Sequence, residues 1–160
     1  MMPTPFSLDE LFEQLKISED PEDISLLQDQ IWTIWLDSGE ASLNYLIGQG
    51  SKAISRKDLS SAIELFTQAI EQAPDWPEGW NKRATAYYLR GNLKAAKDDI
   101  EETLRLESRH FGALSGLAAI YTTIGDLQNA LTTAERLREL VPGDDGVQQQ
   151  VKELREQLGL

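Results

Sequence analysis

The sequence lacks cysteine altogether and has a single histidine among its 160 residues. Without cysteine, disulfide bonds, thiolate metal sites and cysteine nucleophiles are excluded, and without a second histidine neither a zinc site nor a Cys/His catalytic pair can form. Long apolar runs are also lacking, since none approaches the roughly 18 residues that a membrane span needs. Residues 1–11 have neither the basic start nor the apolar core of a secretory signal. The default expectation is therefore a soluble, cytoplasmic protein, unless a signal has been removed upstream.

Basic residues are scarce, with 15 Lys and Arg against 27 Asp and Glu, which gives a net charge of −12. The imbalance is concentrated in residues 1–42, where ten acids face one base, Lys16, for a charge of −9, while the remainder has seventeen acids against fourteen bases, for −3. Binding to phosphates needs clustered Lys and Arg, so we expect no nucleic-acid partner. The acidic segment is interpreted as a solvated face; the alternative is a docking surface for a basic partner.

The sequence does contain one pattern three times, at a spacing of 34 residues. The recurring positions are Gly50, Ala53, Ala62, Phe66, Ala69 and Pro74, then Ala84, Tyr87, Ala96, Ile100, Thr103 and Ser108, then Ala118, Tyr121, Ala130, Ala134, Leu137 and Pro142. A period of this length is typical of helical units that stack side by side and present a surface, because one unit is too small to enclose a reaction.

The pattern resembles the tetratricopeptide repeat family, whose signature places Trp, Leu-Gly and Tyr on a first helix and Ala and Phe on a second, with a closing Pro. The matching residues are Trp80, Ala84, Tyr87 and Ala96 in the middle repeat, and Leu114, Leu117, Ala118, Tyr121, Ala130 and Pro142 in the third. Arg83 and Gln49 depart from the usual Leu, and Ser108 replaces the closing Pro. The resemblance implies an all-α fold, a right-handed α-solenoid of stacked helix-turn-helix repeats.

Three regions are predicted: an acidic helical hairpin in 1–42, three repeats in 43–76, 77–110 and 111–144, and a capping helix in 145–160. Helices are expected near 7–17 and from Pro21 to about 38, then near 43–56, 59–72, 77–90, 93–106, 111–124, 127–140 and 145–158. The opening hairpin is interpreted as a cap or a degenerate repeat that covers the apolar edge of the first repeat. The last helix has the polar outer face of a solubilising cap.

The two-helix units are expected to pack through small residues at each crossing, such as Ala84 and Ala96, with larger side chains around them. Trp80 and Tyr121 are predicted to be core residues. Of the four tryptophans, Trp76 is the one without a clear assignment, because it lies in a loop.

The family's solenoids curve so that first helices line the concave side, and the resemblance supplies that orientation here. The residues expected to line the groove are Asn44, Ile47, Ser51, Glu78, Asn81, Lys82, Thr85, Tyr88, Ser115, Ala119 and Thr122. Asn81 could bond a peptide amide in both directions, and Tyr88 could pack on an apolar side chain. The alternative for each is an ordinary helix-surface residue.

Chaperone-binding members of the family hold a terminal carboxylate with several Lys, Arg and Asn residues. The corresponding positions here are Ile47, Ser51, Lys82, Gly112 and Gly116. Only Lys82 is basic, so no carboxylate clamp is expected, and the acidic tails of heat-shock chaperones are predicted not to bind tightly.

No set of catalytic residues is found in the sequence. His110 is interpreted as a loop or helix-start residue, and the acidic cluster Asp98, Asp99, Glu101 and Glu102 as a solvated convex face. We expect no enzyme activity, no cofactor and no metal.

The leading hypothesis is a non-catalytic module that binds a peptide or partner protein in its groove. The alternative is self-association or self-masking, in which a terminal helix docks on the repeat array, so a homo-oligomer is possible. An enzyme is the third and least favoured reading.

Overall fold

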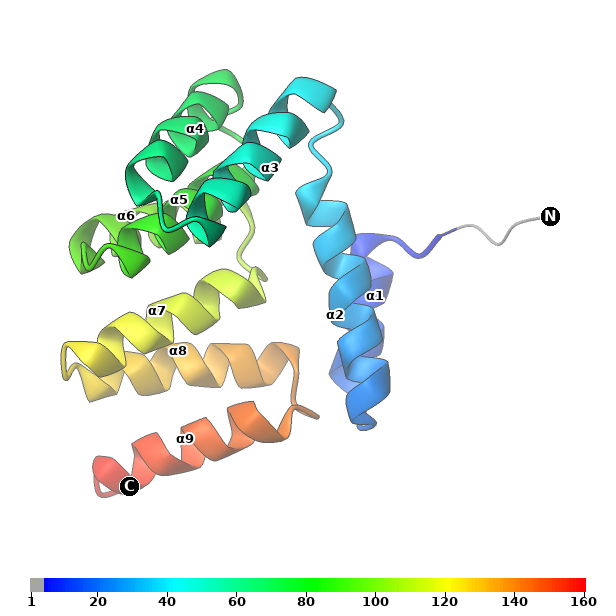
Figure 1. The fold of residues 1–160 in the computed structure, drawn as a ribbon. Coiled ribbons are helices and arrows are strands. Elements are labelled where there is room, and N and C mark those ends of the chain that lie inside the picture. The colour runs from blue at the N-terminus through cyan, green and yellow to red at the C-terminus, as the bar shows by residue number, and fades with distance from the viewer. Residues whose placement is uncertain (1–4) are drawn as a thin grey trace.

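The computed structural model describes residues 5–160 and is all-helical over that range (Figure 1). Its helices are α1 (Leu8–Ile17), α2 (Pro21–Leu36), α3 (Ala41–Ser55), α4 (Leu59–Gln72), α5 (Pro77–Leu89), α6 (Leu93–Leu106), α7 (Phe111–Thr123), α8 (Leu127–Leu140) and α9 (Asp145–Gln157). The pairs α3/α4, α5/α6 and α7/α8 stack in order, followed by α9, while α1 and α2 stand beside the stack. The predicted α-solenoid of helical repeats is confirmed.

The second helix of each repeat begins in the same way, because a side-chain cap recurs every 34 residues. Asp58, Asn92 and Asp126 accept the backbone N–H three residues ahead and so satisfy a donor that the helix itself leaves free. The turn residue before each cap is left-handed, and it is Gly91 and Gly125 in the later repeats. The first repeat has Lys57 at this position, with φ 62°.

The helix crossings pack as the small residues predict. Ala84 and Ala96 are both buried, as are Ala118 and Ala130. In the first repeat the approach is closest, since a Cβ on Gly50 would lie only 2.3 Å from the ring of Phe66. Only glycine can therefore stand at this crossing while Phe66 keeps its place.

Two of the expected core assignments need correction. Trp80 and Tyr121 are partly buried, not fully so. The indole N–H of Trp80 reaches the Pro74 carbonyl at 2.9 Å, and the Arg83 guanidinium lies 5.3 Å from its ring.

The opening hairpin does not lie where the sequence analysis placed it. Its buried residues on α1 and α2 share one apolar cluster with the third repeat and the start of α9, not with the first repeat. The cluster comprises Leu11, Phe12, Leu15, Ile24, Ile31, Trp35, Phe111, Leu114, Leu137, Val141 and Val147. A Cβ on Gly143 would lie 2.1 Å from the Ser18 carbonyl, so the α1–α2 turn rests directly on the backbone before α9.

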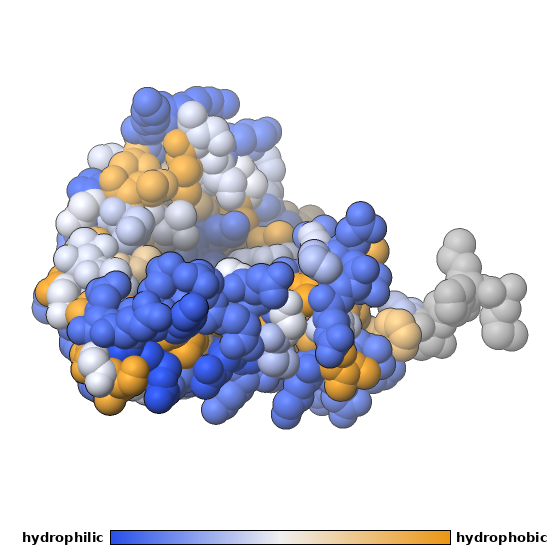
Figure 2. All heavy atoms as spheres, turned by 90° about the horizontal axis from the view of Figure 1, so that it is seen from below, coloured by the Kyte–Doolittle hydropathy of each residue, from blue (hydrophilic) through white to orange (hydrophobic). Residues whose placement is uncertain are grey.

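The helix α9 closes the other end of the stack. Val151 and Leu154 are buried against α8, whereas Val147 belongs to the hairpin cluster. Figure 2 looks onto this end of the molecule, where the surface nearest the viewer is mostly hydrophilic. Within residues 5–160, no helix is both long and apolar enough to cross a membrane.

Candidate functional site

A small cavity of about 160 Å³ opens on the face formed by the first helices of the second and third repeats. It is lined by Asn81, Ala84, Thr85, Tyr88, Ile100, Gly112, Gly116 and Ala119. Four of these, Asn81, Thr85, Tyr88 and Ala119, belong to the predicted groove. The floor is apolar because Ala84 and Ile100 are buried core residues, and glycine on α7 leaves the backbone accessible.

The polar groups of this cavity differ in how far they are already satisfied. The Thr85 hydroxyl donates to the Asn81 carbonyl one turn earlier at 3.2 Å. The residue Asn81 is 8% exposed as a whole and lines the cavity, and within residues 5–160 its side-chain amide has no hydrogen-bond partner. Tyr88 is 39% exposed at the rim. Among residues 5–160 the buried side-chain polar atoms without a partner are Trp35 Nε1 and Glu78 Oε2, so the Asn81 amide keeps access to solvent through the cavity. It is therefore open to a ligand that enters the cavity.

Three other predicted groove residues are not available to a ligand. Ile47 is buried in the core of the first repeat. Asn44 holds the linker before α3, accepting from the Ser38 N–H at 3.0 Å and donating to the Asp37 carboxylate at 3.2 Å. Glu78 is completely buried. The helical period placed these residues on the correct helices but could not show what packs over them.

The remaining predicted residues lie outside the cavity. Ser51 and Lys82 are partly buried, and Ser115 and Thr122 are exposed. The Thr122 hydroxyl donates to the Ala118 carbonyl at 2.8 Å within its own helix. Of the two, Ser115 is the counterpart of Asn81 in the next repeat and offers a matched control for it.

Glu78 forms a buried pair with His110, the N-cap of α7, as the expected helix-start position implies. His110 Nε2 lies 2.5 Å from Glu78 Oε1, and its Nδ1 accepts the Ala113 N–H at 3.0 Å. Because Nδ1 is an acceptor, the neutral ring carries its proton on Nε2, facing the carboxylate. The indole of Trp35 stacks on the imidazole, with centroids 4.2 Å apart. The pair joins the second repeat to the third and is sealed from solvent, which is not the setting of a catalytic base.

A second buried pair corrects the interpretation of the acidic cluster. Asp99 is buried on α6 and accepts two hydrogen bonds from Arg83, at 2.7 and 2.8 Å, while Arg83 also donates to the Thr67 hydroxyl. The hydrogen bonds that Arg83 donates to the Asp99 carboxylate raise the pKa of Arg83 above its ordinary value. The unusual arginine of the middle repeat is thus explained by its partner. Asp98 is exposed, as expected, and pairs with Lys94.

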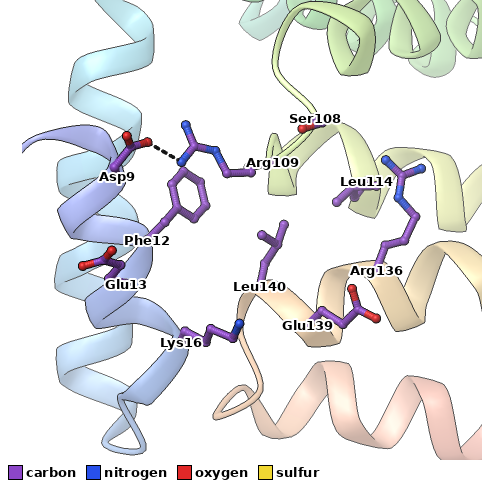
Figure 3. Close-up of a pocket in the computed structure, with 10 residues that line it drawn as sticks. All are labelled: Asp9, Phe12, Glu13, Lys16, Ser108, Arg109, Leu114, Arg136, Glu139 and Leu140. Atoms are coloured by element: carbon purple, nitrogen blue, oxygen red, sulfur yellow. Dashed lines mark hydrogen bonds and ion pairs between the residues drawn. The ribbon is translucent and has the colours of Figure 1, made fainter.

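A larger hollow of about 580 Å³ lies between the hairpin and the third repeat (Figure 3). Its charged lining contains both signs: Asp9, Glu13, Lys16, Arg109, Arg136 and Glu139. Arg109 donates to Asp9 at 2.7 Å across the hollow and lies 4.6 Å from the ring of Phe12. Because the lining carries both signs of charge, the hollow favours neither an anionic nor a cationic ligand. No pattern in the sequence predicts this contact, because its two partners are 100 residues apart.

No cluster of three or more His, Cys, Asp or Glu side chains suited to a metal ion occurs in residues 5–160.

Sequence comparisons place the chain beside repeat proteins. A TPR repeat-containing protein of Rhizobium etli is 42% identical over 151 residues, which are 94% of this chain and 74% of that protein. The small glutamine-rich tetratricopeptide repeat-containing protein 2 of Mycosarcoma maydis is 29% identical over 122 residues, covering 76% of this chain but only 35% of that protein. No family model matches the chain.

Solved structures show the same fold. The first TPR of Spaghetti, bound to the HSP90 peptide SRMEEVD, superimposes with a TM-score of 0.69 at 22% identity, over 74% of this chain and 94% of that one. The Sgt2 TPR domain from Aspergillus fumigatus gives a TM-score of 0.67 at 26% identity, over 75% of this chain and 81% of that one.

Proposed function

Since the chain belongs to the tetratricopeptide repeat family, we propose that it is a non-catalytic module that binds an extended peptide segment of a partner protein on α5 and α7. The observation that carries the proposal is the side-chain amide of Asn81, which lines the cavity and, within residues 5–160, is not engaged in a hydrogen bond. A peptide backbone offers both a donor and an acceptor, which is the combination that an Asn side chain can satisfy.

The size of the cavity limits what enters it. Ligand pockets for drug-sized molecules measure roughly 300 to 1,000 Å³, whereas this cavity measures about 160 Å³. One aliphatic side chain is the proposed occupant, with the ring of Tyr88 packing against it at the rim. Gly112 and Gly116 let the peptide backbone approach α7 closely.

The proposed ligand does not depend on a terminal carboxylate. Of the five positions that correspond to a carboxylate clamp, Lys82 alone is cationic, and its ammonium group lies over the Trp32 ring at 5.9 Å from the centroid. The Spaghetti domain binds the acidic peptide SRMEEVD, and we predict that this chain does not bind it tightly. One ammonium group provides too little charge to hold a carboxylate against solvent screening.

The proposal is tested with a displayed library of random 12-residue peptides selected on the full chain. Peptides that bind the wild type should bind Asn81→Ala roughly tenfold more weakly, since the bound peptide loses the hydrogen bonds that the Asn81 amide supplies. Ser115→Ala, at the equivalent position of the next repeat, should bind them unchanged. Selected peptides that ignore Asn81→Ala and Tyr88→Ala would refute the proposed site. Tight, salt-sensitive binding of SRMEEVD that is lost in Lys82→Ala would refute the absence of a clamp.

Self-masking is the second candidate, and one observation favours it. The indole of Trp32 on α2 touches the backbone of α7 at Gly112, which also lines the cavity. A terminal helix of the chain therefore borders the surface on which the peptide is proposed to bind.

A further inference from the structure

The two tryptophans of α2 that face the repeats have different roles. Trp35 is 7% exposed, stacks on His110, and accepts the indole N–H of Trp76 on its carbonyl at 3.0 Å. Trp32 is one turn earlier and stays partly exposed. Trp35 therefore anchors the hairpin. Trp32 packs edge to face on it, with centroids 5.5 Å apart, and extends from there toward the first helices.

The Trp32 ring contacts residues of both first helices, α5 and α7, beside the cavity. A Cβ on Gly112 would be 2.7 Å from two carbon atoms of the indole, so the ring rests on bare backbone of α7. From α5, the Lys82 ammonium is 5.9 Å from the centroid of the ring. Lys82 forms no salt bridge within residues 5–160.

Lys82 and Gly112 form a seat for an aromatic ring, and the rings of His110 and Phe111 border it, with centroids 5.2 and 5.6 Å from that of Trp32. A glycine backbone admits a flat side chain closely, and an unpaired ammonium group is attracted to the face of a π-system. Gly112 also lines the cavity that the proposed function assigns to an aliphatic side chain, so the seat and the cavity share one wall.

We propose that the groove has a second subsite, built by Lys82 and Gly112, that recognises an aromatic side chain, and that Trp32 fills it in the unliganded protein. The inference rests on the proposed function and specifies its ligand: a peptide with an aromatic residue near an aliphatic one. Binding displaces the Trp32 ring while Trp35 keeps the hairpin docked. The hairpin thereby holds the groove partly closed against peptides without an aromatic residue.

The subsite is tested without any peptide, by replacing Trp32→Ala in the full chain and adding N-acetyl-tryptophanamide. The amide signals of Gly112 and Gly116 should shift on titration in this variant and stay fixed in the wild type, where the seat is occupied. Ile34→Ala, an exposed apolar position on the same helix, is the matched control and should show no shift. Adding Gly112→Ala to Trp32→Ala fills the seat with a methyl group and should weaken binding roughly tenfold.

Detachment of the hairpin does not spoil this test, because both residues of the seat belong to the repeats. If the Trp32→Ala variant ignores N-acetyl-tryptophanamide, the subsite is refuted even when library peptides bind through Asn81. If the variant binds the probe but no library peptide depends on Asn81, the subsite stands and the proposed function fails. Library peptides with an aromatic residue should bind Trp32→Ala more tightly than wild type. Weaker binding would show that Trp32 contacts the bound peptide, and would refute the proposal that the peptide displaces it.

Discussion

The three repeats are held together by contacts between helices that follow one another in the chain, whereas the α1–α2 hairpin is held by contacts with residues far away in the sequence. Within the repeats, buried clusters join helices that are adjacent in the chain, such as Ala62 and Phe66 with Leu43 and Ile47. The hairpin cluster instead joins Phe12 to Phe111. A period of 34 residues specifies the first kind of contact and says nothing about the second. The difference also implies two separable units of stability, since the repeats need only their neighbours.

The largest expected effect separates these units directly. Phe66→Ala and Phe12→Ala each remove a buried phenyl ring, at about 3 to 5 kcal/mol. We expect Phe66→Ala to lower the free energy of unfolding of the repeats, whereas Phe12→Ala should speed amide exchange in α1 and α2 and leave α3 to α6 protected. Hydrogen exchange measured by mass spectrometry gives both results. Equal loss of protection along the whole chain in Phe12→Ala would show that the hairpin and repeats are one cooperative unit.

A slightly smaller effect is expected inside the second repeat. Asp99→Ala leaves the Arg83 guanidinium without its buried partner and should lower the free energy of unfolding by about 3 kcal/mol, since one-sided loss of such a pair is strongly destabilising. Asp98→Ala, its exposed neighbour, should change it by less than about 0.5 kcal/mol. Urea denaturation of both variants measures the contrast. Similar free energies of unfolding for the two variants would indicate that Asp99 belongs to a solvated face, as the sequence analysis expected.

Two glycines of α3 should respond with opposite signs. Gly50→Ala drives a methyl group into Phe66 and should destabilise the first repeat by about 1 to 3 kcal/mol. A Cβ on Gly48 meets nothing within 4 Å, so Gly48→Ala should stabilise the helix by about 0.5 to 1 kcal/mol. Thermal unfolding of each variant measures the difference. Partial rescue of Gly50→Ala by Phe66→Leu would assign the effect to this contact.

The smallest effect concerns the linker that joins the two regions. Hydrogen bonds from the Gly39 N–H, and then from the Asn44 amide, lower the pKa of Asp37 below its ordinary value of 3.8. A carboxyl whose pKa is lowered by folding stabilises the folded linker fully at pH values above its pKa in the unfolded chain. This stabilisation is lost as the pH falls through the pKa of the folded protein. Amide exchange at Gly39 should accelerate in that acid range. Asp37→Ala should make the exchange fast at neutral pH as well and remove its dependence on this ionisation.

The sequence predicted the repeats better than the site, for a physical reason. Helix ends depend on local residues such as Asn92 and Gly91, and those are readable in order along the chain. Glu78 and Asp99 were expected on the surface because charge is rarely buried, and their partners lie 32 and 16 residues away. Burial of a charge depends on a partner that no periodicity identifies. The position of the hairpin depends on such remote contacts alone.

The contact between Asp9 and Arg109 spans 100 residues, and this separation sets an order of events during synthesis. At ribosomal rates of roughly 5 to 20 residues per second, Arg109 is made about 5 to 20 s after Asp9, and the rest of the docking surface, up to Val147, follows it. The repeats can form one after another meanwhile, because each needs only the previous one. Until then the apolar side chains of α1 and α2 face water, so the hairpin reaches its final position only after the repeat on which it docks has been made.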